Sequence, residues 1–208
     1  MKLYKDFVPA VSIILPTFNR AYIIERAICS VIKQTAVDWE LLIVDDGSED
    51  NTFDICSKFT SENSKIRYLR HSNRKLPISL NVGIKAAAGK FITFIGSDDE
   101  YMPKHLKLRI DYFKKHSEVE LVHGGVKIIG NNFVKDKNDL SKKINLIDCV
   151  IGGTFFGKKE VFEKLNGFKD IEYSEDSDFF ERAKFAKVII EEVNFQTYIY
   201  HRDTKDSI

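Results

Sequence analysis

Residues 41–48, Leu41-Leu42-Ile43-Val44-Asp45-Asp46-Gly47-Ser48, carry an apolar run straight into two acids and a turn. The run is short, aliphatic and bounded by a turn, which is typical of a strand that is buried on both faces. Strands of this kind belong to parallel sheets, where the loops at their carboxyl ends bind ligands. The stretch therefore predicts an acidic pair at the ligand-binding edge of a parallel sheet.

The same alternation of strand and helix fills the first hundred residues. Strands are predicted at 11–15, 66–69 and 91–95, and helices at 23–32, after Ser48 or Asp50, at 77–88 and after Pro103. Asn19 is the expected cap of the first helix, and Gly89 is the expected left-handed stop of the helix that begins at Pro77. This order indicates an α/β protein with a Rossmann-like, mostly parallel central sheet flanked by helices.

The second half is less regular, and we expect mixed or antiparallel strands there. A strand is predicted at 120–123, a hairpin that turns at 130–132 between 128–129 and 133–134, and two short strands at 188–190 and 197–200. Helices are predicted at 159–165, ended by Gly167, and at 176–186, while 135–143 is interpreted as a solvated loop. No repeat or linker interrupts residues 1–208, which predicts a single domain with two halves, about 1–100 and about 101–208.

Composition excludes several classes of protein. Thirty-two Lys and Arg against 31 Asp and Glu give a net charge of +1, so no overall field favours nucleic acid or an anionic membrane. Three widely spaced cysteines fit neither a disulfide framework nor a zinc knuckle. The apolar run after Lys2 and Lys5 is too short for a signal peptide, and none approaches a membrane span. We expect a cytoplasmic protein, at most peripheral at the inner face of the plasma membrane.

Acids recur at the predicted edge of the sheet. Asp45-Asp46 and Asp98-Asp99 each follow a strand, and Pro16-Thr17-Phe18-Asn19 follows the first strand. Clustered carboxylates repel one another unless one is protonated or a divalent cation joins them, and Mg²⁺ or Mn²⁺ bridging to a diphosphate suits oxygen ligands. The alternative is that Asp46 and Asp98 are ordinary caps and turn acids. Neither a dinucleotide fingerprint nor a phosphate loop is present.

These stretches resemble the successive signatures of family 2 glycosyltransferases with the GT-A fold. The matching segments are 11–20, Val44-Asp45-Asp46-Gly47-Ser48 and Gly96-Ser97-Asp98-Asp99. The resemblance implies inverting transfer of one sugar from a nucleotide sugar to a glycan or lipid-linked hydroxyl in surface polysaccharide assembly. It places Pro16, Thr17, Phe18, Asn19, Asp46, Asn81 and Asp98 around the nucleotide and donor, and Asp99 on a divalent metal.

The later motifs resemble the family's acceptor side. Glu175-Asp176 is similar to its Glu-Asp signature, which makes Asp176 the expected base, while Gly153-Thr154 resembles the acceptor loop. A carboxylate can take the proton of an attacking hydroxyl, although an acidic first turn of a helix is the alternative. His201 is expected at the metal or diphosphate, or on the surface.

Two departures from the family pattern leave alternatives open. Ser97 stands where an acid is common, and Leu80-Asn81 stands where a basic residue often precedes Asn. The diphosphate is therefore expected to use Arg74, Lys75 or Arg202. An active transferase that uses a UDP-hexose or a UDP-N-acetylhexosamine is the main hypothesis, with Mn²⁺ or Mg²⁺ as its cofactor. A degenerate sugar-nucleotide or glycan-binding module, and a nucleotidyltransferase, are the others.

Overall fold

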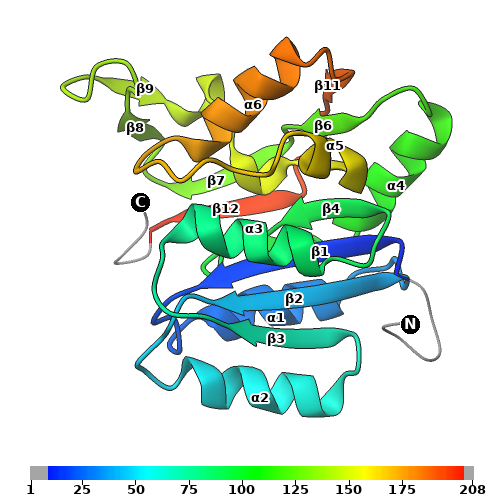
Figure 1. The fold of residues 1–208 in the computed structure, drawn as a ribbon, viewed down its shortest axis with the longest axis vertical. Coiled ribbons are helices and arrows are strands. Elements are labelled where there is room, and N and C mark those ends of the chain that lie inside the picture. The colour runs from blue at the N-terminus through cyan, green and yellow to red at the C-terminus, as the bar shows by residue number, and fades with distance from the viewer. Residues whose placement is uncertain (1–8, 204–208) are drawn as a thin grey trace.

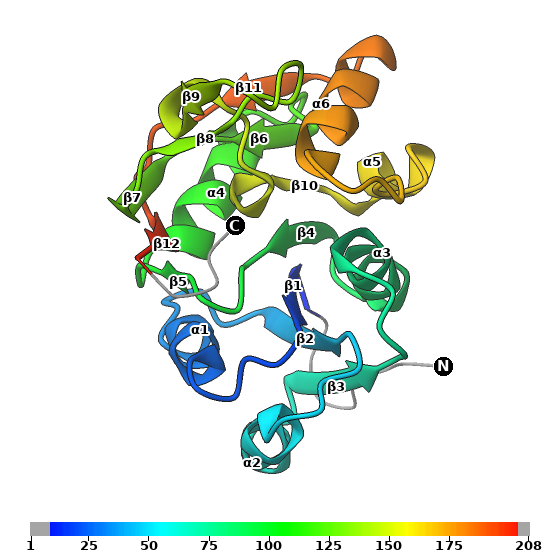
Figure 2. The ribbon, with the colours of Figure 1, turned by 90° about the vertical axis from the view of Figure 1, so that its left-hand side faces the viewer.

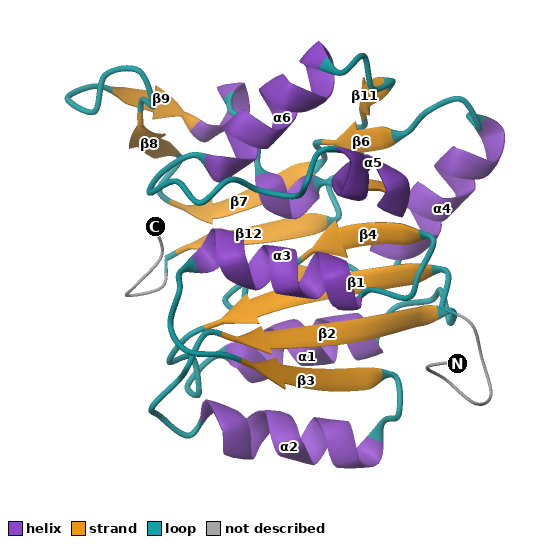
Figure 3. Ribbon diagram, in the orientation of Figure 1, coloured by secondary structure: helices purple, strands orange, loops and turns teal. Residues whose placement is uncertain are grey.

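The chain forms a central mixed sheet covered by helices on both faces, as the computed structural model in Figure 1 and Figure 3 shows. The structure describes residues 9–203, so Lys2 and Lys5 lie outside the described residues. The main sheet has seven strands in the order β11-β6-β10-β4-β1-β2-β3. These strands are β1 (Val11–Thr17), β2 (Trp39–Asp45), β3 (Ile66–Arg70), β4 (Phe91–Phe94), β6 (Leu121–His123), β10 (Phe156–Lys158) and β11 (Ile190–Glu192).

The first four strands are parallel, as the sequence predicts. β1 lies between β2 and β4, with Thr17 paired to Asp45 and Ile14 paired to Phe94. β10 breaks the pattern, because it runs antiparallel to both β4 and β6. The strong aliphatic run of β2 is buried along its whole length, as expected of a strand with helices on both sides. The parallel order brings the carboxyl ends of β1, β2 and β4 to one edge.

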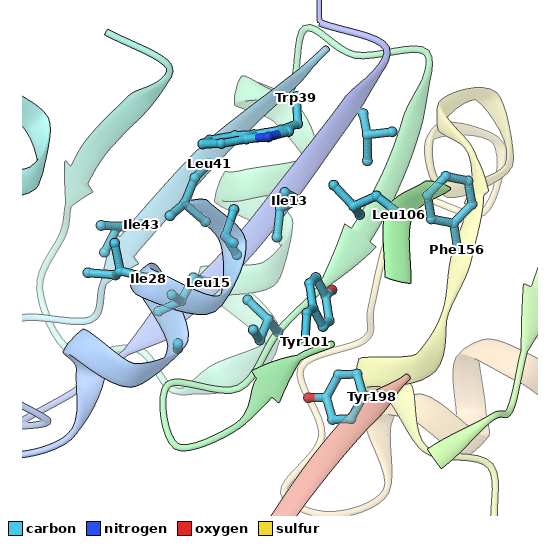
Figure 4. Packing of buried hydrophobic residues seen from close by; sticks show 14 of the residues in the cluster. Ile13, Leu15, Ile28, Trp39, Leu41, Ile43, Tyr101, Leu106, Phe156 and Tyr198 are labelled. Carbon is cyan, nitrogen blue, oxygen red and sulfur yellow. The ribbon is translucent and has the colours of Figure 1, made fainter. Parts of the chain in front are cut away.

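Alternate residues of β1 enter two different cores. Ile13 and Leu15 pack with α1 (Ile24–Ile32) and α4 (His105–Lys115), in the cluster that Figure 4 shows. Ile14 faces the other side, with α3 (Leu76–Ala86), α5 (Lys159–Lys164) and α6 (Glu175–Phe185). The period of two along a strand produces this division. Figure 2 views the sheet from its edge, with α1 and α3 on opposite sides and α2 (Thr52–Glu62) beside β3.

Two small sheets complete the second half. β12 (Tyr198–Arg202) lies between β5 (Glu100–Tyr101) and β7 (Val126–Gly130), and β8 (Phe133–Lys135) pairs with β9 (Lys143–Asn145). The short 3-10 helices are η1 (Leu146–Asp148) and η2 (Gly152–Thr154). Among the helices of residues 9–203, none combines the length and apolar character needed to cross a bilayer.

Three local predictions were wrong. The predicted hairpin at 128–134 does not form, because β7 pairs with β12 and β8 pairs with β9, so the segment interpreted as a loop is itself a hairpin. Asn19 does not cap α1: its side chain accepts the N–H of Glu49 instead. Gly89 is not left-handed, and a Cβ there would lie 2.6 Å from the Ser12 nitrogen, so close backbone approach explains the glycine.

Candidate functional site

The loops after β1, β2 and β4 meet at one cavity of about 470 Å³. The backbone N–H of Asp46 donates to the Thr17 carbonyl at 2.8 Å, which holds the first two loops together. Residues from the second half close the opposite wall, namely Ile151, Gly152, Gly153, Phe168, Glu175, Asp176, Tyr198 and Tyr200. Asp46 and Asp99 therefore open onto the same cavity, together with Asp98 and Asp176. Its volume lies within the range of small-ligand sites.

The first wall of the cavity is organised by Asp46, and we call this region the Asp46 corner (residues 16–18, 46 and 71–75). The two carboxylate oxygens of Asp46 accept the backbone N–H groups of Arg74 at 2.7 Å and Lys75 at 2.9 Å. His71 Nδ1 lies 3.3 Å from the same carboxylate. One acid thus fixes the conformation of the loop that passes over this end of the cavity.

Backbone geometry at the Asp46 corner explains the Asp-Gly sequence. Gly47 has a φ of 82°, and a Cβ on it would lie 2.9 Å from the Asn73 nitrogen. Glycine is the residue that adopts this conformation without strain and allows the approach. Thr17 Oγ1 is buried nearby, and no hydrogen-bond partner for it lies among residues 9–203. Buried hydroxyls of proteins normally have a partner, so this one is an exception.

The middle of the cavity carries Asp98 and Asp99. Asp99 is 2% exposed and accepts the Tyr198 hydroxyl at 2.5 Å and the His201 backbone N–H at 2.8 Å. Burial, and then the charge of Asp98, raise the pKa of Asp99 to about 7. A neighbouring cation would offset the cost of ionising the buried Asp99, because it favours the charged form of the carboxyl.

Tyr198 is a residue whose role at the site the sequence analysis missed. Its hydroxyl donates to Asp99 and accepts the N–H of Gly96 at 3.1 Å. A Cβ on Gly153 would lie 2.3 Å from that hydroxyl, so the glycine lets the loop pack directly on the tyrosine. The segment 198–202 could have indicated it, but the sequence analysis gave roles only to His201 and Arg202 of that segment. The hydrogen bond to Asp99 spans 99 residues, so spacing along the chain did not indicate it.

Asp176 and Glu175 form the opposite corner, which we call the Asp176 corner (residues 151–153 and 175–176). Asp176 lies in the first turn of α6 and accepts the N–H of Gly152 at 3.0 Å and of Ser177 at 2.7 Å. Burial raises the pKa of Asp176, and burial followed by the Asp176 charge raises the pKa of Glu175. A carboxyl that resists ionisation is suited to accept a proton.

The position of α6 is fixed by a separate set of contacts. Asp178 accepts Arg182 Nε at 2.7 Å and Lys169 Nζ at 3.0 Å. Arg182 also donates to the carbonyls of Leu165 and Gly167, which end the α5 segment. These contacts tie the helix to its neighbour without using the acids that face the cavity.

Four of the predicted site residues do not line the cavity. Asn19 accepts the N–H of Glu49 in the loop before α2. The side-chain amide of Asn81 donates to the Phe168 carbonyl at 2.7 Å and accepts the Phe168 N–H at 2.8 Å. Thr154 bonds to Gly124 and Ile151. The ring nitrogens of His201 lie 2.9 Å from Glu100 and 3.2 Å from Asp203. In each case the side chain bonds to other protein groups, a role that sequence motifs do not distinguish from contact with ligand.

The cationic side chains agree only in part with the sequence-based expectation of Arg74, Lys75 or Arg202. Arg20 and Lys75 line the cavity, whereas Arg74 contributes its backbone N–H to Asp46. Arg202 donates to the Phe133 carbonyl at 3.4 Å, and its guanidinium lies 5.8 Å from the ring of Tyr200, which lines the cavity. Two positive side chains therefore stand beside the acidic cluster, where an anionic ligand would need them.

The acids are compatible with a divalent metal only if the ligand supplies further oxygens. Within residues 9–203 there is no group of three or more His, Cys, Asp or Glu placed to hold a metal ion. A Cβ on Gly96 would lie 2.5 Å from Asp99 and 3.1 Å from Asp98, so both carboxylates flank the same small residue. Mg²⁺ is commonly held by one or two carboxylates together with substrate phosphates. The donor set fits that arrangement.

The comparisons with known proteins agree with this geometry. The family model "Glycosyl transferase family 2" matches residues 12–169. A relative in Escherichia coli, "UDP-Glc:alpha-D-GlcNAc-diphosphoundecaprenol beta-1,3-glucosyltransferase WfgD", is 36% identical over 147 residues, covering 68% of this chain and 57% of the relative. The chain thus spans a little over half the length of that relative.

Solved structures share the fold at lower identity. TarS 1-349 of S. aureus in complex with UDP-GlcNAc superposes with a TM-score of 0.79 and 20% identity, covering 95% of this chain and 60% of the TarS 1-349 chain. The mannosyltransferase PcManGT of Pyrobaculum calidifontis, solved with GDP-Man and Mn²⁺, gives a TM-score of 0.77 and 17% identity, covering 97% and 59%. Both have the GT-A fold, which confirms the predicted fold class. With three quarters of its length matched by the family model, the chain belongs to glycosyl transferase family 2.

Proposed function

We propose that this chain is the catalytic part of an inverting glycosyltransferase. It moves one sugar from a UDP-sugar donor to a hydroxyl of a lipid-linked glycan. The observation that carries the proposal is the meeting of Asp46, Asp98, Asp99 and Asp176 at one cavity. The relative named for UDP-Glc and a diphosphoundecaprenol acceptor supports both substrate classes. The TarS complex with UDP-GlcNAc supports a UDP-sugar donor.

The nucleotide is assigned to the Asp46 corner. Pro16 and Phe18 offer apolar surface there, and the unpartnered Thr17 hydroxyl offers a hydrogen bond. The Asp46 carboxylate accepts two backbone N–H groups and retains lone pairs that can accept an N–H of the base. Asp98 is assigned to the ribose. Pairing with a base edge gives this corner selectivity for one nucleobase.

The diphosphate is assigned to the middle of the cavity. Asp99 would hold a Mn²⁺ or Mg²⁺ ion together with the diphosphate oxygens, and when bound this ion would supply Lewis-acid stabilisation of the leaving group. Tyr198 and the His201 N–H orient the Asp99 carboxylate. Arg20 and Lys75 add positive charge beside the leaving diphosphate.

The role of the base that takes the acceptor's proton is assigned to Asp176. As the acceptor oxygen attacks the anomeric carbon, the bond to the diphosphate breaks and the hydroxyl proton passes to the Asp176 carboxylate. The N–H groups of Gly152 and Ser177 orient that carboxylate, and its burial makes proton uptake favourable. Gly153 and Glu175 are assigned to the acceptor. Attack from the face opposite the leaving group inverts the anomeric centre.

A ligand screen followed by a turnover assay tests the proposal. UDP with Mn²⁺ should raise the melting temperature by about 5–10 °C at one hundred times Kd, whereas GDP and dTDP should give smaller shifts. Turnover is then measured with UDP-glucose and UDP-N-acetylglucosamine and a polyprenyl-diphosphate sugar. UDP binding without transfer to any acceptor would assign the chain to the degenerate binding class, and the absence of any nucleotide effect would refute the proposal.

A further inference from the structure

The β8–β9 hairpin and the turn after it expose several large apolar side chains. We call residues 133–147 the hairpin surface. Phe133 is 50% exposed, Leu140 59% and Ile147 76%. The N–H of Leu146 donates to the Asn132 carbonyl at 2.8 Å, which brings Ile147 beside the start of β8. The hairpin projects from the body of the molecule on the side toward which β1 and β2 point (Figure 1).

Lysines are interleaved with these apolar groups. Lys135, Lys137, Lys142 and Lys143 are all exposed. Four lysines against two aspartates give residues 133–147 a net charge of +2, while the whole chain carries only +1. Lysine is depleted in the cores of protein–protein interfaces, whereas lysine beside Phe and Leu is typical of elements that lie at a membrane surface. The composition therefore favours an anionic bilayer over a protein partner.

The hairpin surface is also connected to the Asp176 corner. The hydroxyl of Tyr173, two residues before Glu175, donates to the Lys135 carbonyl at 2.6 Å. Burial raises the pKa of Asp176, and the positive charge of Lys137 is one of the smaller effects that oppose this rise. The chain continues from the hairpin surface through η1 directly to Ile151 and Gly152 in the cavity wall. An object held by the hairpin surface would thus lie at the mouth of the cavity.

We propose that the hairpin surface docks the protein on an anionic phospholipid bilayer. Phe133, Leu140 and Ile147 enter the head-group region, and the lysines contact lipid phosphates. This inference rests on the proposed function, since it explains how an acceptor embedded in a membrane reaches the Asp176 corner. Apolar burial and charge act together here, because each contributes only a modest free energy at a membrane surface.

Vesicle flotation tests the inference. The chain is mixed with vesicles of phosphatidylglycerol and phosphatidylcholine, or of phosphatidylcholine alone, and the bound fraction is measured. Binding to the anionic vesicles should be stronger by about tenfold or more. The triple variant Phe133→Ser, Leu140→Ser and Ile147→Ser should lose binding by about tenfold or more. The double variant Lys135→Gln and Lys143→Gln should weaken binding to anionic vesicles only.

A matched variant controls for the loss of exposed apolar surface elsewhere. Val37, Phe53 and Phe185 are 65%, 52% and 93% exposed and lie outside the hairpin surface, so changing all three to serine should leave vesicle binding unchanged. Both triple variants should keep the melting shift with UDP, which separates a failure of docking from a failure of the proposed function. Equal binding to both vesicle types, or full binding by the hairpin variant, would overturn the inference. So would a wild-type chain that binds neither vesicle, an outcome that would leave the surface to a protein partner.

Discussion

The two acidic corners of the cavity each centre on a carboxylate that accepts two backbone N–H groups, but the donors differ in where they lie along the chain. At the Asp46 corner, the loop is organised around the acid: Arg74 and Lys75 turn their N–H groups onto one carboxylate. At the Asp176 corner, the carboxylate accepts the N–H groups of Gly152 and of its neighbour Ser177. Burial raises the pKa of this carboxyl. The proposed function uses this difference, with the nucleotide at the Asp46 corner and the proton at the Asp176 corner.

The largest expected effect is that of Asp176→Asn. The amide keeps the shape of the side chain but cannot take the proton, so kcat should fall by about 10²–10⁴-fold while UDP affinity changes little. Glu175→Gln, at the neighbouring position, is the control and should lose less. Steady-state kinetics and calorimetry with UDP measure the two quantities. Full activity in Asp176→Asn would remove Asp176 as the base.

Asp46→Ala changes the other corner, and it should lower the affinity for UDP rather than kcat. The change leaves the N–H groups of Arg74 and Lys75 without their acceptor and frees the loop. The affinity for UDP should fall about tenfold or more, because an unpaired buried donor costs roughly 1–3 kcal/mol. Under saturating donor, kcat should recover most of its value. A variant that loses kcat but keeps UDP affinity would contradict the division between the corners.

Gly153→Ala tests whether the Asp176 corner is joined to Asp99 through Tyr198. The new Cβ would lie 2.3 Å from the Tyr198 hydroxyl, so the loop or the tyrosine must move. We expect about a tenfold loss of kcat, because small displacements in an active site are costly. Circular dichroism checks that the variant is folded. Unchanged kinetics would show that the contact between Gly153 and Tyr198 has no role in turnover.

The smallest expected effect is on the stability of the metal-free protein, and Asp99→Asn measures it. The pKa of Asp99 is raised from 3.8 to about 7, so between these values the folded state binds more protons than the unfolded state. The stability of the metal-free protein therefore falls as the pH rises from about 4 through about 7. The asparagine removes this loss, and the variant should melt roughly 2–8 °C higher than the wild type at pH 8. Equal melting temperatures of the two proteins at pH 8, measured with chelator, would contradict a raised pKa of Asp99.

The first half of the chain was predictable because its signals are local. The apolar run of β2, the Asp-Gly turn and Pro77 in the first turn of α3 each act within a few residues. The parallel order then places the acids at one edge without further information. Where this half was misjudged, at Asn19 and Gly89, the true partners lie 30 and 77 residues away.

The second half was less predictable because its short strands have several possible partners. β7 and β8 are separated by two residues that suit a turn, yet β7 pairs with β12 and β8 with β9. Strands of three to five residues carry too little pattern to specify a register. Packing of the whole domain selected the pairing. The same holds for Asn81 and His201, whose side chains were expected at ligands but bind protein groups.

The amino-acid sequence by itself determined the family, the parallel sheet and the edge at which Asp46, Asp98 and Asp99 lie, because strand order and motif composition are properties of contiguous residues. Only the tertiary structure decided that Tyr198 and Gly152 donate hydrogen bonds to Asp99 and Asp176. It also decided that the side chains of Asn81 and His201 bond to protein groups. These roles depend on distances between residues far apart in the chain, and such distances are set by packing.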